Sequence, residues 1–223
     1  MEFDNETIRI AVQLYVINEK EGEEKYGHID TWNVSGVTNM SYMFSGAHSF
    51  NQPLSNWNVS NVTDMRGMFS HTKAFNQPLN DWNVSNVTNM WHVFNNTKAF
   101  NQPLNNWNVS KVINMFGMFC CASSFNQPLD NWNVSNVISM IKMFKYALSF
   151  NQPLSNWDVG NVTNMHSMFG GASSFNQHLN NWNVSGVTNM SYMFNITTIG
   201  EMLEKHNLTN ENYFDKNVYH ELF

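Results

Sequence analysis

The sequence has little charge, few prolines and almost no cysteine. Charged residues make up 13% of the 223 positions, about half of the ~25% that is typical of globular proteins. The two cysteines, Cys120 and Cys121, are neighbours and cannot cross-link distant segments, which excludes a disulfide framework. Five prolines and 11 glycines also exclude a collagen-like chain and a disordered chain rich in proline and glycine.

Charge and hydrophobic patterning exclude two further classes of protein. A net charge of −6 leaves no basic surface for phosphate groups, which argues against nucleic acid as a partner. No stretch reaches the ~18 apolar residues of a membrane-spanning helix, so membrane insertion is not expected. The chain instead contains 38 asparagines, 15 methionines and 14% aromatic residues, which supply ample material for a core.

The chain is built from a repeat of 25 residues. Tryptophan recurs at this interval from Trp32 to Trp182, a period that is typical of repeat proteins. Six full units run from Trp32 to Asn181 and a seventh breaks off after about Phe194; one unit reads WNVSNVTDMRGMFSHTKAFNQPLND. Thirteen of the 15 methionines and 13 of the 17 phenylalanines occupy fixed positions, so we assign them to the core rather than to a metal or cofactor site.

Each unit predicts a short strand and a short helix. Within residues 65–72, apolar side chains are spaced i, i+3, i+4, i+7, which is one face of a helix, and Thr63 is placed to cap it. Residues 54–62 have the L-x-x-L-x-L spacing of a leucine-rich repeat. The predicted fold class is α/β: a leucine-rich-repeat-like solenoid with one parallel strand and one helix per coil, and a helical cap at both ends.

Charge divides the chain into three parts. The net charge is −5 over residues 1–31, +2 over residues 32–197 and −3 over residues 198–223. Because terminal repeats need a polar outer face, we interpret these as an N-terminal acidic helical cap, a seven-coil solenoid and a C-terminal helical cap. The first cap helix is expected to open at Asp4 or Asn5, and the second to span residues 199–206.

The unit W-N-V-S-N-V-T-N-M-x-x-M-F-x-x-A-x-x-F-N-Q-P-L resembles the 25-residue repeat of the BspA-like leucine-rich-repeat surface proteins, which include mycoplasma lipoproteins. The resemblance covers residues 32–197 and implies a non-catalytic surface or adhesion protein. The N-terminus shows no signal peptide or lipobox, and the segment KYGHI at 25–29 resembles leaderless copies in large DNA viruses. We therefore expect a location in the cytoplasm or within a viral particle rather than secretion.

No catalytic or metal-binding pattern is recognisable. Ligands or paired carboxylates on stacked coils must occupy the same or neighbouring repeat positions in adjacent coils. The five histidines of the array occupy five different positions, and no two of its four aspartates share one. We expect neither an enzyme nor a cofactor.

The positions that vary from coil to coil predict a protein-binding surface. On a helix, Trp91, Phe116 and Ile141 would be neighbours on three successive coils, at the edge of the apolar face. A contiguous exposed apolar patch with a charged rim is typical of a protein contact. The candidate residues are Arg66, Trp91, His92, Phe116, Ile141, Lys142 and His166. The competing interpretation is that these side chains fold over the coil edges as extra core.

The predicted strand face offers an alternative site. It carries one polar column flanked by serines, formed by Asn58, Asn83, Asn108, Asn133 and Asp158. Stacked asparagines can hydrogen-bond along the array, and so uniform a surface suggests a repetitive ligand such as a polysaccharide. The sequence thus favours a non-enzymatic scaffold with a protein partner, and leaves open glycan binding and self-association as a structural component. It identifies neither the partner nor the oligomeric state.

Overall fold

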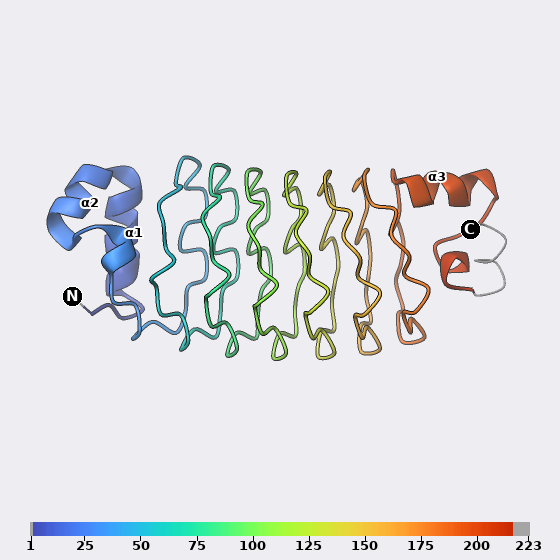
Figure 1. Cartoon of the computed structure of the whole chain (residues 1–223), viewed down its shortest axis with the longest axis horizontal. Helices are drawn as coiled ribbons and strands as arrows, with labels where there is room; N and C mark the ends of the chain where they lie inside the picture. Colours follow the sequence, from blue (N-terminus) through green and yellow to red (C-terminus); the bar gives the residue numbers. More distant parts are fainter. Residues whose placement is uncertain (1, 216–223) are drawn as a thin grey trace.

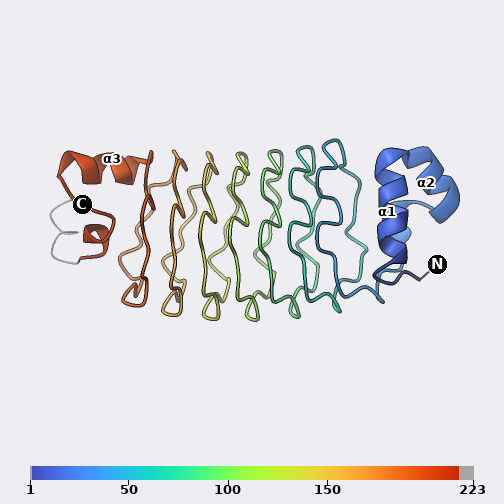
Figure 2. The same ribbon diagram turned by 180° about the vertical axis from the view of Figure 1, so that it is seen from behind.

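The computed structural model describes residues 2–215 and shows an elongated stack of coils with helices only at its two ends (Figure 1). Helices α1 (Thr7–Ile17) and α2 (Glu19–Tyr26) and the 3-10 turn Ile29–Thr31 form the N-terminal end. Helix α3 (Thr198–Lys205) and the 3-10 turn Asn212–Phe214 form the other end. Seen from behind, the coils follow one another in chain order (Figure 2).

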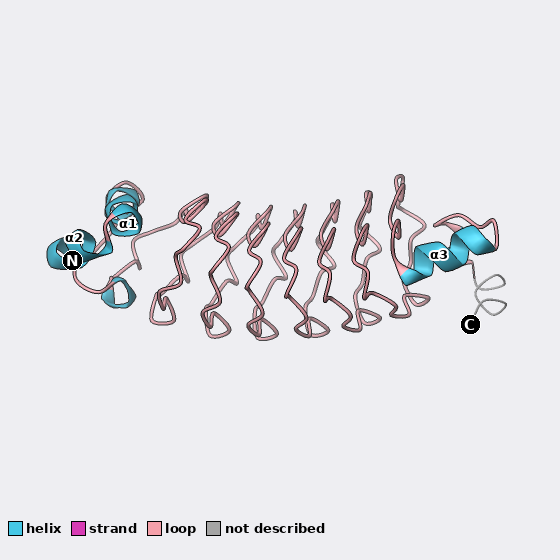
Figure 3. Cartoon of the chain, turned by 90° about the horizontal axis from the view of Figure 1, so that it is seen from above, coloured by secondary structure: helices cyan, strands magenta, loops and turns pink. Residues whose placement is uncertain are grey.

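The predicted α/β fold class is wrong. Between the two end regions, the described residues form neither an α-helix nor a strand, and the coils of Figure 3 are loops throughout. β-type pairing is reduced to one isolated parallel bridge between successive coils, from Asn39↔Asp64 to Asn164↔Asn189. The array is therefore not a leucine-rich-repeat solenoid with one strand and one helix per coil.

The stretch that was predicted as a helix is a run of turns. In the second coil, the N–H groups of Met68, Ser70 and Thr72 donate to the carbonyl three residues back, at 3.0–3.1 Å. The alternate N–H groups donate instead to carbonyls of the next coil, at 2.7–2.9 Å; they belong to Gly67, Phe69 and His71. A helix would keep all of these bonds within one segment, so the coils hold each other together instead.

Left-handed residues produce this alternation. Each coil has two residues with positive φ, four positions apart, such as Gly67 (+56°) and His71 (+62°) in the second coil. A helix requires negative φ throughout, so no continuous helix can form across these positions. Gly67 is also required sterically, because a Cβ there would lie 2.5 Å from the ring of Tyr42 in the preceding coil.

The predicted core is confirmed. Every tryptophan, methionine and phenylalanine at the fixed positions of the array is at most 8% exposed. Rings at equivalent positions stack from coil to coil, with centroids 5.6 Å apart for Phe94 and Phe119 and 6.4 Å apart for Trp107 and Trp132. The indole N–H of Trp107 also donates to the carbonyl of Leu79 in the preceding coil at 2.8 Å. The apolar spacing thus identified the buried side chains correctly, although their backbone is a run of turns.

Thr63 does not cap a helix, contrary to expectation. The Thr63 hydroxyl and N–H both donate to the carbonyl of Thr38, at 3.3 and 2.9 Å. Ile113 and Ile138 occupy the same repeat position without a hydroxyl, and their N–H groups continue the same ladder between coils at 2.9 Å. Both isoleucine side chains are about half exposed.

Both ends contain a helix where one was expected. Asp4 Oδ1 accepts the N–H of Thr7 at 2.8 Å just before α1. Helix α1 buries Ile8, Ala11, Val12 and Tyr15, whereas Val16 is exposed. Thr197 caps α3 by accepting the N–H of Gly200. Helix α3 buries Ile199 and Leu203 against the last coil.

The N-terminal segment takes the place of a preceding coil. Asn5 Oδ1 accepts the N–H groups of Thr38 and Asn39, at 2.9 and 3.0 Å. The Arg9 guanidinium donates to the carbonyls of Ser41 and Asn39, at 2.8 and 3.3 Å. In later coils, backbone N–H groups of the preceding coil donate to the equivalent carbonyls, so Arg9 completes the first coil.

We expect Trp107→Phe to lower the free energy of unfolding by about 2 kcal/mol, because the buried Leu79 carbonyl loses its donor. Urea unfolding followed by circular dichroism measures the change. Ser124→Ala, at an exposed serine whose hydroxyl makes no hydrogen bond within residues 2–215, serves as the control. A Trp107→Phe midpoint equal to that of the control would contradict the assigned role of the indole bond.

We expect Arg9→Ala to cost on the order of 1 kcal/mol, since two carbonyls at the edge of the first coil lose a charged donor that is itself partly solvated. Arg9→Lys should recover only part of this loss, because one ammonium cannot reproduce the guanidinium fork. Thermal unfolding of both variants, with Lys20→Ala as an exposed cationic control, tests the prediction. Equal stability of Arg9→Ala and wild type would show that water replaces the guanidinium.

Candidate functional site

The candidate residues lie in the runs of turns, on one side of successive coils. Trp91, Phe116 and Ile141 follow the first methionine of their units, and His92 and Lys142 come one position later. We use the name variable surface for the full set of candidates, which are all half-buried: Arg66, Trp91, His92, Phe116, Ile141, Lys142 and His166.

Backbone hydrogen bonds hold the variable surface in register. The N–H of His92 donates to the carbonyl of Phe116 at 2.9 Å, and the N–H of Lys142 donates to that of His166 at 2.9 Å. Between them, the carbonyl of Ile141 accepts the N–H of Gly117 at 2.8 Å. None of these bonds involves a side chain, so the frame stays the same while the side chains change from coil to coil.

Three rings of the variable surface contact each other, and we name them the aromatic cluster: Trp91, His92 and Phe116. The Trp91 and Phe116 rings meet edge to face, with centroids 5.9 Å apart, a favourable arrangement for aromatic pairs. The His92 ring lies 5.0 Å from that of Phe116 and 5.1 Å from that of Trp91. Lys142 Nζ is 5.9 Å from the Phe116 ring centroid, within reach of a cation–π contact.

This arrangement corrects the geometry inferred for a helix. A helix would place His92 and Lys142 opposite the apolar face, but both contact Phe116. The cause is the left-handed backbone at His92 (φ +58°), which turns its ring over Gly117 of the next coil. A Cβ at Gly117 would lie 2.4 Å from that ring, so the glycine makes room for the histidine.

Sequence reasoning missed this pairing of a large residue with a small one. The signal was present, because the same position alternates along the array between a large residue and a glycine or serine: Tyr42, Gly67, His92, Gly117, Lys142, Ser167 and Tyr192. Each large side chain in the first half of this series covers the glycine that follows it, as the close approaches at Gly67 and Gly117 show.

The Trp91 indole carries a buried polar group. Its Nε1 atom is shielded from solvent and has no hydrogen-bond partner within the described residues. Leaving a buried donor unpaired costs roughly 1–3 kcal/mol. The aromatic cluster is therefore less well satisfied than the core tryptophans, whose indole N–H groups donate to carbonyls, as that of Trp107 does.

Two charged or polar residues of the variable surface, Arg66 and His166, contact partners outside the aromatic cluster. Arg66 Nε lies 2.9 Å from a carboxylate oxygen of Asp64 in its own coil. His166 Nδ1 is 2.8 Å from the hydroxyl of Ser191, and its ring meets that of Tyr192 edge to face at 5.8 Å. Side-chain contacts thus join the aromatic cluster and Lys142, whereas Arg66 and His166 make separate contacts in other coils.

The alternative site is an exposed column, but it is not a hydrogen-bonded ladder. Asn58, Asn83, Asn108, Asn133 and Asp158 are all exposed, and each Oδ1 accepts the N–H two residues later in its own coil, at 3.1–3.2 Å. The asparagine ladder lies in another column, where, for example, Asn76 Oδ1 accepts the N–H of Asn101 at 2.9 Å. The prediction of a hydrogen-bonded asparagine ladder on this face is therefore wrong.

Two overlapping segments of the chain, residues 15–123 and 102–206, match the family described as Mycoplasma protein of unknown function, DUF285. The chain belongs to this family. Membership agrees with the resemblance of the repeat to those of mycoplasma proteins. No curated protein matches the sequence of this DUF285 member.

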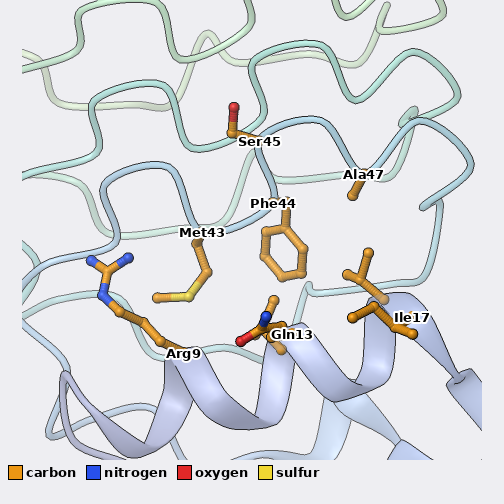
Figure 4. A pocket seen from close by; sticks show the side chains of 9 residues that line it. Arg9, Gln13, Ile17, Met43, Phe44, Ser45 and Ala47 are labelled. Atoms are coloured by element: carbon orange, nitrogen blue, oxygen red, sulfur yellow. The ribbon is translucent and has the colours of Figure 1, made fainter.

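This DUF285 chain has a groove between α1 and the first coil (Figure 4). It encloses about 220 Å³ and is lined mainly by apolar side chains, including Val12, Ile17, Met43 and Phe44. The charged group at its edge, Arg9, is already bound to backbone carbonyls. The groove therefore offers no free charge to orient a ligand.

Two further findings concern the described part of the chain. Within residues 2–215, no group of three or more histidine, cysteine or acidic side chains is placed to hold a metal ion. None of the helices described there is long and apolar enough to cross a membrane.

We expect the aromatic cluster to weaken below about pH 6.5. Burial lowers the pKa of His92 below its usual value, and the charges of His71 and Lys142 act in the same direction. The unfolded chain then binds more protons than the folded one, so stability is complete above the unfolded pKa and is lost as the pH falls toward the folded pKa. Urea unfolding at pH 7 and pH 5 measures this loss.

The variant His92→Gln should lose less stability between these two pH values than the wild type. His206→Gln, at an exposed histidine beyond α3, is the matched control and should keep the wild-type pH dependence. An unchanged pH dependence in His92→Gln would show that His92 does not couple to folding.

Proposed function

We propose that this protein is a non-enzymatic repeat scaffold that binds a protein partner through the variable surface. The observation that carries the proposal is the aromatic cluster: Trp91 and Phe116 meet edge to face, half-buried, beside the cationic Lys142. Tryptophan and other aromatic residues dominate the energetics of protein interfaces. Their half-burial also fits the competing interpretation as core cover, which the experiment below separates.

Positive charges in the runs of turns favour an acidic partner. Lys73, Lys98, Lys142 and Lys145 all lie in the runs of turns of coils two to five. Within residues 2–215, none of these four lysines is in an ion pair with a carboxylate. A surface with unpaired positive charge attracts a negatively charged partner and speeds its association.

The test compares what wild type and the triple variant Trp91→Ser, Phe116→Ser, Ile141→Ser capture from a lysate of the native cells, by quantitative mass spectrometry. The matched control is Asn83→Ala, Asn108→Ala in the alternative candidate site. We expect one protein to be retained by wild type and control and reduced at least tenfold in the triple variant, a loss of ~1.4 kcal/mol or more.

Circular dichroism and urea unfolding must show that the triple variant folds. The single change Lys142→Glu, which removes no core side chain, provides a second measurement and should weaken capture in a salt-dependent manner. Equal capture by wild type and both variants would contradict the proposal and leave the aromatic cluster as core cover.

Glycan binding through the polar column is the second candidate. It is supported by the exposure of Asn83 and Asn108 and by an open hollow beside them, lined by Asp81, Trp82 and Asn106. Under this alternative, the control variant Asn83→Ala, Asn108→Ala would lose a polysaccharide ligand that the triple variant keeps. Self-association as a structural component would instead appear as a mass that rises with concentration in light scattering.

We also propose that, within the DUF285 family, this chain is related more closely to the BspA-like surface proteins and their copies in large DNA viruses. It rests on the repeat unit and on segment 25–29, whereas DUF285 membership gives only the broader relationship. A surface or adhesion role in this group would agree with a protein-binding scaffold.

A further inference from the structure

The adjacent cysteines form a paired thiol site in the fourth coil. Their Sγ atoms are 3.7 Å apart and share a hydrogen bond. Both thiols are free and half-buried, so reagents can reach them. Equivalent positions in neighbouring coils hold unrelated pairs, Asn95-Asn96 and Lys145-Tyr146, so the core does not require cysteine here.

The backbone on both sides fixes the two thiols. The carbonyl of Cys120 accepts the N–H of Asn96 in the preceding coil, and the N–H of Cys121 donates to the carbonyl of Lys145 in the following coil, each at 2.7 Å. Cys121 is in the left-handed region, at φ +58°. The two sulfur atoms therefore come from a turn that both neighbouring coils hold in place.

The separation of the sulfur atoms suits chelation. Two thiolates that bind one ion with metal–sulfur bonds of ~2.3 Å at a tetrahedral angle lie about 3.8 Å apart. A disulfide fits less well, since neighbouring Cα atoms are ~3.8 Å apart, below the usual range of ~4.4–6.8 Å for a disulfide. The two sulfur atoms, 3.7 Å apart, would hardly have to move to bind one ion, but would have to move much closer together to form a disulfide.

Positive charge surrounds the pair. The hydrogen bond from Cys120 and the nearby ammonium groups of Lys145 and Lys98 lower the pKa of the Cys121 thiol. The same hydrogen bond and burial raise the pKa of Cys120, which keeps its proton and donates it. Cys121 is thus shifted toward thiolate, the form that binds metals and attacks electrophiles, while Cys120 stays protonated.

We propose that Cys120 and Cys121 form a dithiol site that chelates one soft, thiophilic ion or metalloid, of the class of trivalent arsenicals and Cd²⁺. Because no third ligand side chain completes a site within residues 2–215, the remaining coordination positions are filled from solution. With an organoarsenic oxide, two As–S bonds form, the As=O bond breaks, and the two thiol protons leave with the oxygen as one water molecule. No oxidation occurs in this step.

The test uses phenylarsine oxide with the full chain, reduced beforehand by a phosphine, in the presence of excess monothiol. Intact mass spectrometry should show one adduct per chain that a small dithiol removes. Cys120→Ser and Cys121→Ser should each reduce the adduct at least tenfold, because a single thiolate cannot resist the competing monothiol. Circular dichroism confirms that both variants fold.

The outcome that overturns the proposal is an adduct of equal yield in either single variant, or no adduct in wild type. Lys145→Gln separates electrostatics from geometry: it should slow adduct formation several-fold at pH 7 and leave one adduct per chain. Unchanged kinetics in this variant would overturn the role of the lysine. The site does not depend on the proposed protein-binding function, because the assay contains no partner.

Discussion

Hydrogen bonding between successive coils is the interaction on which the whole structure depends. No coil contains a regular helix or strand, so a coil alone pairs only part of its own backbone. Alternate N–H groups such as those of Gly67 and Phe69 are satisfied only when the next coil is in register, and the Trp107 indole reaches back to Leu79. Since buried polar groups must be paired, a 25-residue period without insertions follows from the hydrogen bonding as well as from the apolar packing.

The sequence was sufficient to predict the period, the buried side chains and a helix at each end, but not the backbone of the coils. An i, i+3, i+4, i+7 pattern fits a helix, yet a run of turns with a left-handed residue at every fourth position buries the same side chains, such as Met68 and Phe69. A helix and a run of turns differ in which carbonyls accept the alternate N–H groups, and the spacing of apolar residues carries no information about that. Glycines at Gly67 and Gly117 were the signal against a helix, since both occupy a left-handed position.

For the candidate site, the sequence predicted which residues are neighbours but not how they are engaged. Trp91 and Phe116 do meet on successive coils, because a column in a repeat of fixed length stacks whatever the backbone. Three features depend on side-chain directions: the contact of His92 with Phe116, the Trp91 indole that is buried and has no partner within residues 2–215, and the ion pair of Arg66 with Asp64. Those directions follow from the left-handed backbone, which the helix model lacked.

The direction of the hydrogen bonds makes the two ends of the array chemically different. The first coil presents carbonyls and N–H groups that Arg9 and Asn5 satisfy, so the N-terminal segment substitutes for a missing coil. At the other end, the N–H groups of Tyr192 and Ile196 have no acceptor within residues 2–215, and both side chains are exposed. Helix α3 therefore covers the last apolar surface without continuing the ladder.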